Sequence, residues 1–436
     1  MNITNTNNSN DIYQSADYKR SRKAYAAQCT FEYFVSILVT DAFLAKLLTH
    51  MGISDSAIGI ISSLVSFSFL FQLLAIYLMS HLKNTKKTVI TFDTLSQLFF
   101  LGIYLIPFLP FTVGTKTIIV ITCILLAYIC KYLIYSLCFK WANSYVSPEK
   151  RGEFSSIKEM ISLFTGIIFT LAAGYVVDYF ENIRNLEGGF LFIAAAMLIL
   201  NICNFISLLL IKNDTPQVQT AKKADLKTIL QNTLGNRSFI YVIIMTSLWD
   251  MGRLMTVGFL GTFKTSDLLL SVGAVQVINM VANLCRLAIA RPFGRYSDKT
   301  SYAKGFRLGM TLAAVGFAIN IFTTKQTWWC IIIYTILYNV SYAGINQNSY
   351  NITYSYVKSD YIVQAMAIKG SICGILGFCS ALVGSRILQT IQNAGNTFLG
   401  IPVYGQQILS AISLLIILVA ILFSVFVVEK QSRMVQ

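Results

Sequence analysis

The sequence predicts an all-α membrane protein in which twelve transmembrane helices form two pseudo-symmetric bundles of six. The first observation is composition: 55% of the 436 residues are hydrophobic, 12% are charged, and the mean hydropathy is +0.63. So few polar residues cannot coat a soluble protein of this length. The second is a series of long apolar segments, which cross a bilayer as helices because a helix satisfies its own backbone polar groups. The third is a short polar run that recurs at matching places in the two halves.

Twelve apolar segments are long enough to cross the membrane. A helix needs about 20 apolar residues to cross the roughly 30 Å hydrocarbon layer. The expected spans are residues 26–48, 57–80, 88–109, 116–141, 156–179, 189–211, 238–263, 271–290, 305–324, 327–355, 361–388 and 404–428. Because their number is even, we expect both chain termini on the same side of the membrane.

Positive charge identifies that side as cytoplasmic, since Lys and Arg accumulate in short cytoplasmic loops. Most basic residues lie on the side of the termini, and the opposite side holds Lys46, Lys116, Arg184, Lys264 and Lys325. We therefore expect a multi-pass protein of the cytoplasmic (inner) membrane with both termini in the cytoplasm. The net charge of +15 then reflects topology and contact with the anionic lipid bilayer, and it does not indicate nucleic-acid binding.

Polar segments divide the chain into five parts. Residues 1–23 are polar and lack the apolar core of a signal peptide, so we expect a disordered cytoplasmic tail. An N-terminal six-helix bundle over 24–212 and a C-terminal six-helix bundle over 238–428 are joined by a cytoplasmic linker at 213–237. Residues 429–436 form a second cytoplasmic tail.

Cysteine and histidine usage argues against metal and cofactor chemistry. The nine cysteines all fall inside the expected spans without a CxxC pair, and the two histidines, His50 and His81, lie at opposite membrane faces. We expect no metal site and no cofactor. The chain also offers no large soluble domain and no phosphate-binding loop, so an enzyme or a signalling receptor is disfavoured.

Two polar runs follow the second and eighth spans in the same register. SHLKNT begins at Ser80, which is 21 residues after Gly59, and GRYSDK begins at Gly294, which is 21 residues after Gly273. This register aligns Asn84 with Asp298. Many transporters carry two similar halves with the binding site between them. The register therefore predicts duplicated halves.

The later run resembles the GxLxDR signature of the major facilitator superfamily, which lies between helices two and three and recurs in weaker form between helices eight and nine. Tyr296 replaces the usual Leu here, and in the earlier run Ser80 and Asn84 stand where Gly and Asp are expected. SPEKRG at 147–152 is similar to the PxxxRG that leads into helix five of that family. The resemblance implies two six-helix bundles and transport by alternating access.

The resemblance also implies a cytoplasmic latch in the loops that carry these runs. Glycine permits close helix approach, and the Asp298 carboxylate suits the positive N-terminus of a helix in the other half, near Arg151. By the same symmetry, Asn84 would meet the start of helix eleven near Asp360. The expected latch residues are Asn84, Arg151, Gly294, Arg295, Asp298 and Lys299. The alternative is an ordinary basic loop that ends in a turn.

Ionisable residues inside spans are candidates for function, because each costs about 2.5–3.5 kcal/mol at the bilayer centre. They are Glu32, Asp41, Asp93, Lys131, Asp250, Arg253, Arg286 and Lys369. Asp41 and Asp93 lie near span ends, where an interfacial position is an equal alternative. Lys369 also lies near a span end, and its long side chain would allow it to snorkel toward the interface.

Several of these residues lie on polar helix faces that would be wasted against lipid. Gln28, Glu32, Ser36 and Thr40 recur every four residues of the first span, which predicts a stripe facing a central cavity. Helices four, seven, eight and ten add charged and aromatic residues. We expect the solute to contact Glu32, Lys131, Tyr135, Trp249, Asp250, Arg253, Asn283, Arg286 and Tyr338. The alternatives are that Asp250 and Arg253 only neutralise each other and that the tyrosines pack between helices.

A charged and aromatic cavity predicts uptake of a small polar organic solute, such as a sugar, an organic acid or an amino compound. A carboxylate in such a cavity binds a proton more readily than in water, so Glu32 is the candidate for proton-coupled symport. The alternative is a permanently ionised Glu32 bridged to Lys131 or Arg286. Proton-driven export of drugs or metabolites is the alternative function, although residues 166–178 lack the GxxxGPxxGG run typical of exporters. We expect a monomer.

Overall fold

The described part of the chain is almost entirely helical. The computed structural model describes residues 15–74, 84–146, 151–212, 233–357, 362–398 and 400–432. Strands β1 (Thr397–Phe398) and β2 (Ile401–Pro402) pair antiparallel, with Thr397 opposite Pro402 and Phe398 opposite Ile401. Eight segments of the described residues are long and apolar enough to cross a membrane. The predicted class of all-α membrane protein is therefore confirmed.

Contacts divide the chain into two compact units. The first unit consists of residues 1–43 and 74–220, and the second of residues 44–73 and 221–436. The second unit thus includes the segment that holds α4 (Asp55–Ser68) and η1 (Phe69–Phe71). The short helix α3 (Asp41–His50) begins in the first unit and ends in the second.

The first unit contains α2 (Ala16–Leu38), α6 (Thr85–Ile103), η2 (Ile106–Phe108), α7 (Val113–Asn143), α8 (Arg151–Asn182) and α9 (Leu186–Leu210). Helix α2 packs against α8 and α9, and α6 packs against α7 and α9. The rings of Phe34 and Phe169 stack at 4.5 Å between α2 and α8. Trp141 and Tyr145 are buried in a core that also holds Val89 of α6.

Polar side chains define where helices of this unit begin and end. Asn84 Oδ1 accepts the backbone N–H of Lys87 at 3.1 Å and caps α6, and Asn185 does the same for α9 through Gly188. At the other end of α9, Lys86 Nζ donates to the carbonyl oxygens of Leu209 and Ile211. These carbonyls are among the last of a helix, so a cation there is favourable.

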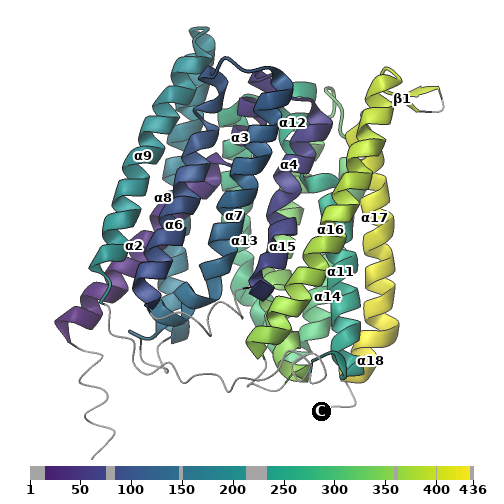
Figure 1. Cartoon of the computed structure of the whole chain (residues 1–436). Coiled ribbons are helices and arrows are strands. Elements are labelled where there is room, and N and C mark those ends of the chain that lie inside the picture. The colour runs from purple at the N-terminus through teal and green to yellow at the C-terminus, as the bar shows by residue number, and fades with distance from the viewer. Residues whose placement is uncertain are drawn as a thin grey trace, which may run out of the picture. The chain divides into compact units, whose positions relative to one another are not determined.

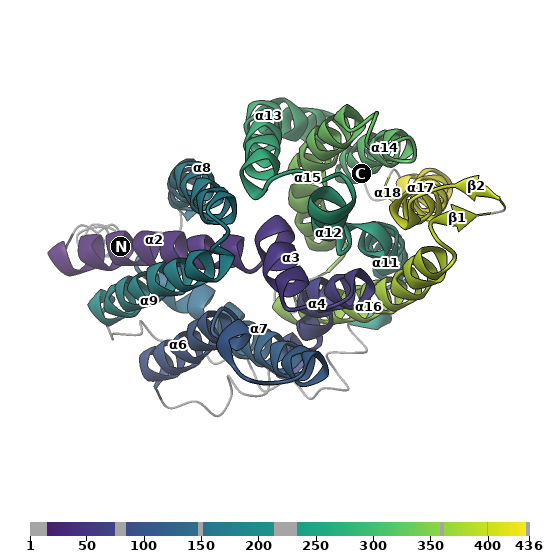
Figure 2. The same cartoon turned by 90° about the horizontal axis from the view of Figure 1, so that it is seen from above.

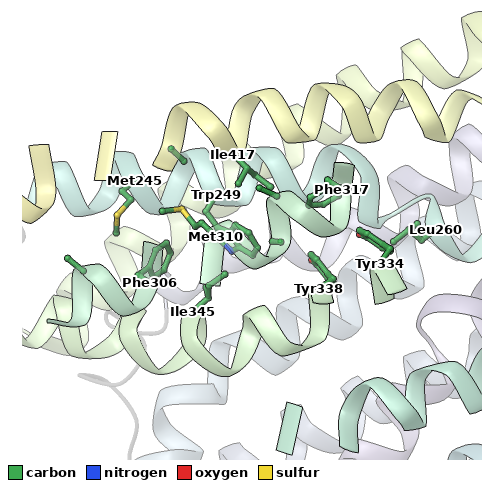
Figure 3. Packing of buried hydrophobic residues seen from close by; sticks show 14 of the residues in the cluster. Met245, Trp249, Leu260, Phe306, Met310, Phe317, Tyr334, Tyr338, Ile345 and Ile417 are labelled. Atoms are coloured by element: carbon green, nitrogen blue, oxygen red, sulfur yellow. The ribbon is translucent and has the colours of Figure 1, made fainter. Parts of the chain in front are cut away.

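The second unit adds α11 (Arg237–Val257), α12 (Leu260–Thr262), η4 (Phe263–Asp267), α13 (Val272–Lys299), α14 (Tyr302–Asn320), α15 (Trp329–Tyr356), α16 (Ile362–Asn393), α17 (Gly405–Phe423), η6 (Ser424–Val428) and α18 (Glu429–Ser432). Helices α14 and α15 lie side by side, as do α11 and α17 (Figures 1 and 2). Between these helices, Trp249, Met310, Phe317, Tyr338 and Ile417 converge in one apolar core (Figure 3).

Helix α4 follows α16 along its length within the second unit. Gln392 donates to Asp55 Oδ2 at 3.0 Å near one end, and Ser371 donates to the carbonyl of Phe69 at 3.1 Å near the other. Between these bonds the backbones approach closely. A side chain at Gly374 of α16 would meet the backbone of Ser66 of α4. Gly59 of α4 instead faces the ring of Phe259, which follows α11, and a side chain there would overlap that ring. The glycines are therefore required by packing.

The first expected span is not one continuous helix. Helix α2 ends at Leu38, and α3 begins at Asp41, which has a left-handed φ of 46°. Thr40 Oγ1 donates to the carbonyls of Ser36 and Ile37 and occupies acceptors at the end of α2. This local competition explains the break within residues 26–48.

Helix α13 also differs from the prediction. We expected this helix to end at residue 290, before the polar run at 291–299. Helix α13 instead continues through it to Lys299, with Pro292 inside the helix. Ser297 Oγ donates to the carbonyl of Phe293 and accepts from Asn348 of α15, while Phe293 covers Gly344. Packing on α15 therefore extends the helix beyond the point where its composition becomes polar.

Candidate functional site

The first unit contains a partly buried ion pair between α2 and α7. Lys131 Nζ lies 2.8 Å from Glu32 Oε1, and only 24% and 22% of the two side chains are exposed. Gln28, one turn earlier on α2, donates to Glu32 Oε2 at 3.0 Å. Both carboxylate oxygens therefore have partners. The polar stripe of the first span supplies the acceptor, and α7 supplies the cation.

Tyrosines and a second lysine surround this pair. The rings of Tyr128 and Tyr132 stack on α7 at 6.1 Å, and Tyr135 follows one turn later with half of its surface exposed. The ammonium of Lys158 lies 4.9 Å from the Tyr25 centroid and acts electrostatically on Glu32. Lys158 is not among the site residues expected from the sequence. Lys158 is the eighth residue of α8, and nothing in its sequence context predicts that it approaches α2.

The second unit contains an ion pair within α11. Arg253 Nε lies 2.5 Å from Asp250 Oδ1, and about a fifth of each side chain is exposed. The adjacent Trp249 packs its ring near Tyr338 at 6.4 Å and near Tyr342 at 6.1 Å. The charged pair therefore lies beside an aromatic cluster formed with α15.

Helix α13 brings a further cation to the same aromatic cluster. The Arg286 guanidinium lies 6.0 Å from the Tyr342 centroid, a distance suited to a cation–π interaction. The Tyr342 and Tyr338 hydroxyls are 3.1 Å apart and share a hydrogen bond. No carboxylate among the described residues forms an ion pair with Arg286. Asn283, one turn earlier on α13, is half-buried.

The expected solute contacts therefore fall into two groups. Glu32, Lys131 and Tyr135 belong to the first unit, and Trp249, Asp250, Arg253, Asn283, Arg286 and Tyr338 belong to the second. The structure shows an ion pair at the centre of the first group and an ion pair beside stacked aromatic rings in the second. Charged groups and aromatic rings within each unit are side chains that can contact polar organic molecules.

The expected latch residues lie at helix ends. Asn84 caps α6, and Gly294, Arg295, Asp298 and Lys299 lie in the last turns of α13. Arg295, Asp298 and Lys299 are exposed, while Phe293 and Ser297 point into the packing with α15. Arg151 is the first residue of α8, its side chain lies outside the described part, and so does Asp360. The proposed pairings of Asp298 and Asn84 stay predictions.

Two residues that were given interfacial alternatives are buried. Asp93 is 6% exposed and accepts a hydrogen bond from Asn204 of α9, so its carboxyl group is buried between helices. Lys369 is 7% exposed, and its Nζ donates to the carbonyl and hydroxyl of Ser349 and to Thr353 Oγ1, so it does not snorkel. Distance from a span end predicts depth in the membrane, and it does not report burial against another helix.

Comparison with known proteins adds sequence and structural relatives. A family model described as Major Facilitator Superfamily matches residues 26–381. A mutant of the nucleoside transporter NupG superposes with a TM-score of 0.73 at 11% identity, covering 93% of this chain and 99% of that one. A bacterial homologue of the human lysosomal transporter Spinster, inward-facing and unoccupied, gives 0.68 at 12% identity, with 97% and 98% covered.

A third solved structure, the peptide transporter POT in complex with sulfate, gives a TM-score of 0.66 at 12% identity, with 92% and 93% covered. No curated protein sequence matches the chain. At these identities the structural likeness establishes the fold, and it agrees with the family match.

Proposed function

The chain belongs to the Major Facilitator Superfamily, and from this premise we propose that it is a secondary active transporter of a small polar organic solute. The family and its solved relatives identify a membrane transporter rather than an enzyme. The proposed solute is a sugar, an organic acid or an amino compound. It crosses the cytoplasmic membrane by alternating access, together with a proton that Glu32 carries.

The observation that carries this proposal is the ion pair of Glu32 and Lys131. A cation and a carboxylate within membrane helices are costly unless they are paired, and such residues mark substrate and proton pathways. A solute with one charged group replaces one partner of the pair and restores its neutrality. A proton on Glu32 has a related effect, because it removes the negative charge that holds Lys131.

The aromatic cluster of the second unit supports an organic solute. Trp249, Tyr338 and Tyr342 offer ring faces, and Arg253 and Arg286 offer guanidinium donors beside them. Rings stack on the apolar faces of an organic molecule, and guanidinium groups bind carboxylate or phosphate with paired hydrogen bonds. Two of the structurally similar proteins are a nucleoside transporter and a peptide transporter, and nucleosides and peptides are polar organic compounds.

A thermal-shift screen of the purified protein tests the solute class. Sugars, carboxylates and amines are added at two pH values, and one class is expected to raise the melting temperature. A solute at 100 times its Kd stabilises the folded protein by about 2.7 kcal/mol, which such a screen detects. The compound found is then offered to proteoliposomes. Proton-coupled symport predicts accumulation driven by an inward proton gradient and its loss when the gradient is collapsed.

Evidence of export would contradict the proposed uptake of the solute. Cells that express the protein would then extrude a cationic dye in a manner that depends on the proton gradient, and proteoliposomes would show no uptake of any compound from the screen. If the solute still accumulates without a proton gradient, the protein is a transporter of that solute, but proton coupling is wrong.

A further inference from the structure

Helices α6 and α9 enclose a polar interface that the proposed solute contacts do not use. Asp93 of α6 is 6% exposed, and Asn204 of α9 is 1% exposed. Asn204 Nδ2 donates to Asp93 Oδ2 at 2.5 Å. Gln97 lies one turn after Asp93 in α6, and its backbone carbonyl accepts a hydrogen bond from Asn201 Nδ2 of α9 at 3.1 Å. Two amide side chains of α9 therefore donate to one carboxyl group and one backbone carbonyl of α6.

This interface has more acceptors than donors. Asn204 Oδ1, Asn201 Oδ1 and Gln97 Oε1 are buried, and each accepts no hydrogen bond from any residue in the described part of the chain. Nearly all buried polar atoms of folded proteins have a partner, because an unsatisfied one costs about 1–3 kcal/mol. An ionised Asp93 adds only acceptor oxygens to this set. A proton on Asp93 adds the missing donor.

The charges around Asp93 also favour a neutral carboxyl group. No cation of the described residues forms an ion pair with Asp93. The titratable groups that act on it are Glu32 of α2 and Lys131 and Cys138 of α7, while α9 contributes the uncharged Asn204. Glu32 and Lys131 neutralise each other at 2.8 Å. A carboxylate at Asp93 would therefore be a buried charge without direct compensation, which is costly.

We propose that Asp93 is a proton-binding site of this transporter and that it holds its proton in the conformation described here. The Asp93 hydroxyl donates to Asn204 Oδ1, while Asn204 Nδ2 donates to the second Asp93 oxygen. This cyclic acid–amide pair satisfies both side chains. Binding consumes one proton from solution and converts a carboxylate to a carboxylic acid, so the charge of the interface rises by one.

The amide donor distinguishes a proton from a metal cation. A bound Na⁺ would need the carboxylate oxygens as ligands, but the Asn204 N–H group already points its positive hydrogen at Asp93 Oδ2. A proton requires only one free oxygen and an acceptor beside it, and Asn204 Oδ1 provides that acceptor. The geometry therefore selects the proton.

The site is connected electrostatically to the ion pair on which the proposed function rests. When Asp93 loses its proton, its negative charge competes with Glu32 for Lys131, and the three side chains together change from neutral to negative. The affinity of Lys131 for an anionic group of the solute then falls. Proton occupancy at Asp93 would in this way regulate solute affinity, and this coupling role depends on the proposed function.

Infrared spectroscopy of the purified full-length protein tests the proton site without any solute. A protonated carboxyl group gives a carbonyl band that a carboxylate lacks. The wild type is expected to show this band at neutral pH, and Asp93→Asn is expected to abolish it. Glu181→Gln, which removes an exposed carboxylate of α8, is the matched control and leaves the band in place. Asn204→Ala retains the band and moves it to higher frequency, because one hydrogen bond to the acid is lost.

A second measurement covers the case in which Asp93→Asn does not fold. Isotope-labelled aspartate in the wild-type protein must shift the same carbonyl band. An unshifted band, a band that survives Asp93→Asn, or a band removed only by Glu32→Gln would overturn the proposal. A melting temperature that rises with Na⁺ at constant ionic strength in the wild type, but not in Asp93→Asn, would assign the site to a metal cation and also overturn it. None of these outcomes depends on transport.

Discussion

Lys131 and Glu32 form an ion pair across α7 and α2 at 2.8 Å, and Gln28 occupies the second oxygen of the carboxylate. Burial of these two charges costs free energy, and the same burial makes each charge depend on the other. The two charges are largely removed from water, so each is tolerated only because the other is present. The same mutual dependence makes the pair responsive to a proton or a charged solute.

The stability of the pair can be tested by neutralising its members in turn. Lys131→Met is expected to lower the free energy of unfolding by about 3 kcal/mol or less, since it leaves Glu32 unpaired while a fifth of that side chain stays exposed. The double variant Glu32→Gln with Lys131→Met should be more stable than Lys131→Met alone, because no unpaired charge remains. Melting temperatures in detergent measure both, with the exposed Lys325→Met as control. A double variant less stable than Lys131→Met would contradict the pairing.

Solute binding should depend on the same lysine. Lys131→Ala is expected to abolish the thermal shift caused by the solute while membrane insertion stays normal, because the charged group of the solute loses its counter-charge. Lys325→Ala, which removes an exposed lysine between α14 and α15, should bind as the wild type does. Unaltered uptake by Lys131→Ala in proteoliposomes would remove Lys131 from the binding site.

The aromatic cluster predicts a graded loss of affinity at Tyr342. Tyr342→Phe keeps the ring that faces Arg286 and loses the hydroxyl bonded to Tyr338, so a small change in Kd is expected. Tyr342→Leu also removes the ring, and the loss of a cation–π contact worth about 0.5–2 kcal/mol should weaken solute binding further. Equal Kd values for the two variants would show that the ring contributes nothing.

The polar end of α13 predicts a kinetic defect. Asp298→Asn is expected to slow turnover more than it weakens solute binding, since the proposed latch acts on the exchange of conformations and not on the solute. Glu181→Gln, an exposed carboxylate near the end of α8, is the control. The comparison requires transport rates and Kd values on the same preparations. Unchanged turnover in Asp298→Asn would discredit the latch.

Close packing of α4 predicts different responses to two glycine substitutions. Gly59→Ala is expected to destabilise the protein by about 1–3 kcal/mol, because its methyl group would overlap the Phe259 ring. Gly102→Ala in α6 meets no atom within 4 Å and should be neutral or stabilising by up to about 1 kcal/mol through helix propensity. Thermal unfolding of the two variants measures the difference, and equal stability would refute the close approach at Gly59.

Contacts within one helix were accessible from the sequence. Gln28 and Glu32 are four residues apart and Asp250 and Arg253 three apart, so helical geometry alone brings each pair together. The hydropathy of the spans likewise identified the class of the fold. Both inferences need only the local repeat of a helix and the thickness of the bilayer.

Contacts between helices were not accessible in the same way. The sequence left Lys131 and Arg286 as alternative partners of Glu32, which lies 99 positions before Lys131, and Asp93 and Asn204 are 111 positions apart. The polar end of α13 was mistaken for a loop because composition records the change in polarity, while the helix continues through packing of Phe293 and Ser297 on α15. Tertiary packing decided each of these cases.

Because residues 44–73 belong to the second unit, proteolysis of the linker between the two halves is not expected to separate them. The polypeptide passes from one unit to the other at three places, near residues 43, 73 and 220. A protease that cleaves between Lys212 and Thr233 would therefore sever only one of three tethers. Helix α4 of the N-terminal fragment would stay packed against α16 of the C-terminal fragment, and the two fragments are expected to co-purify. The two halves expressed as separate chains are expected to associate through the same contact.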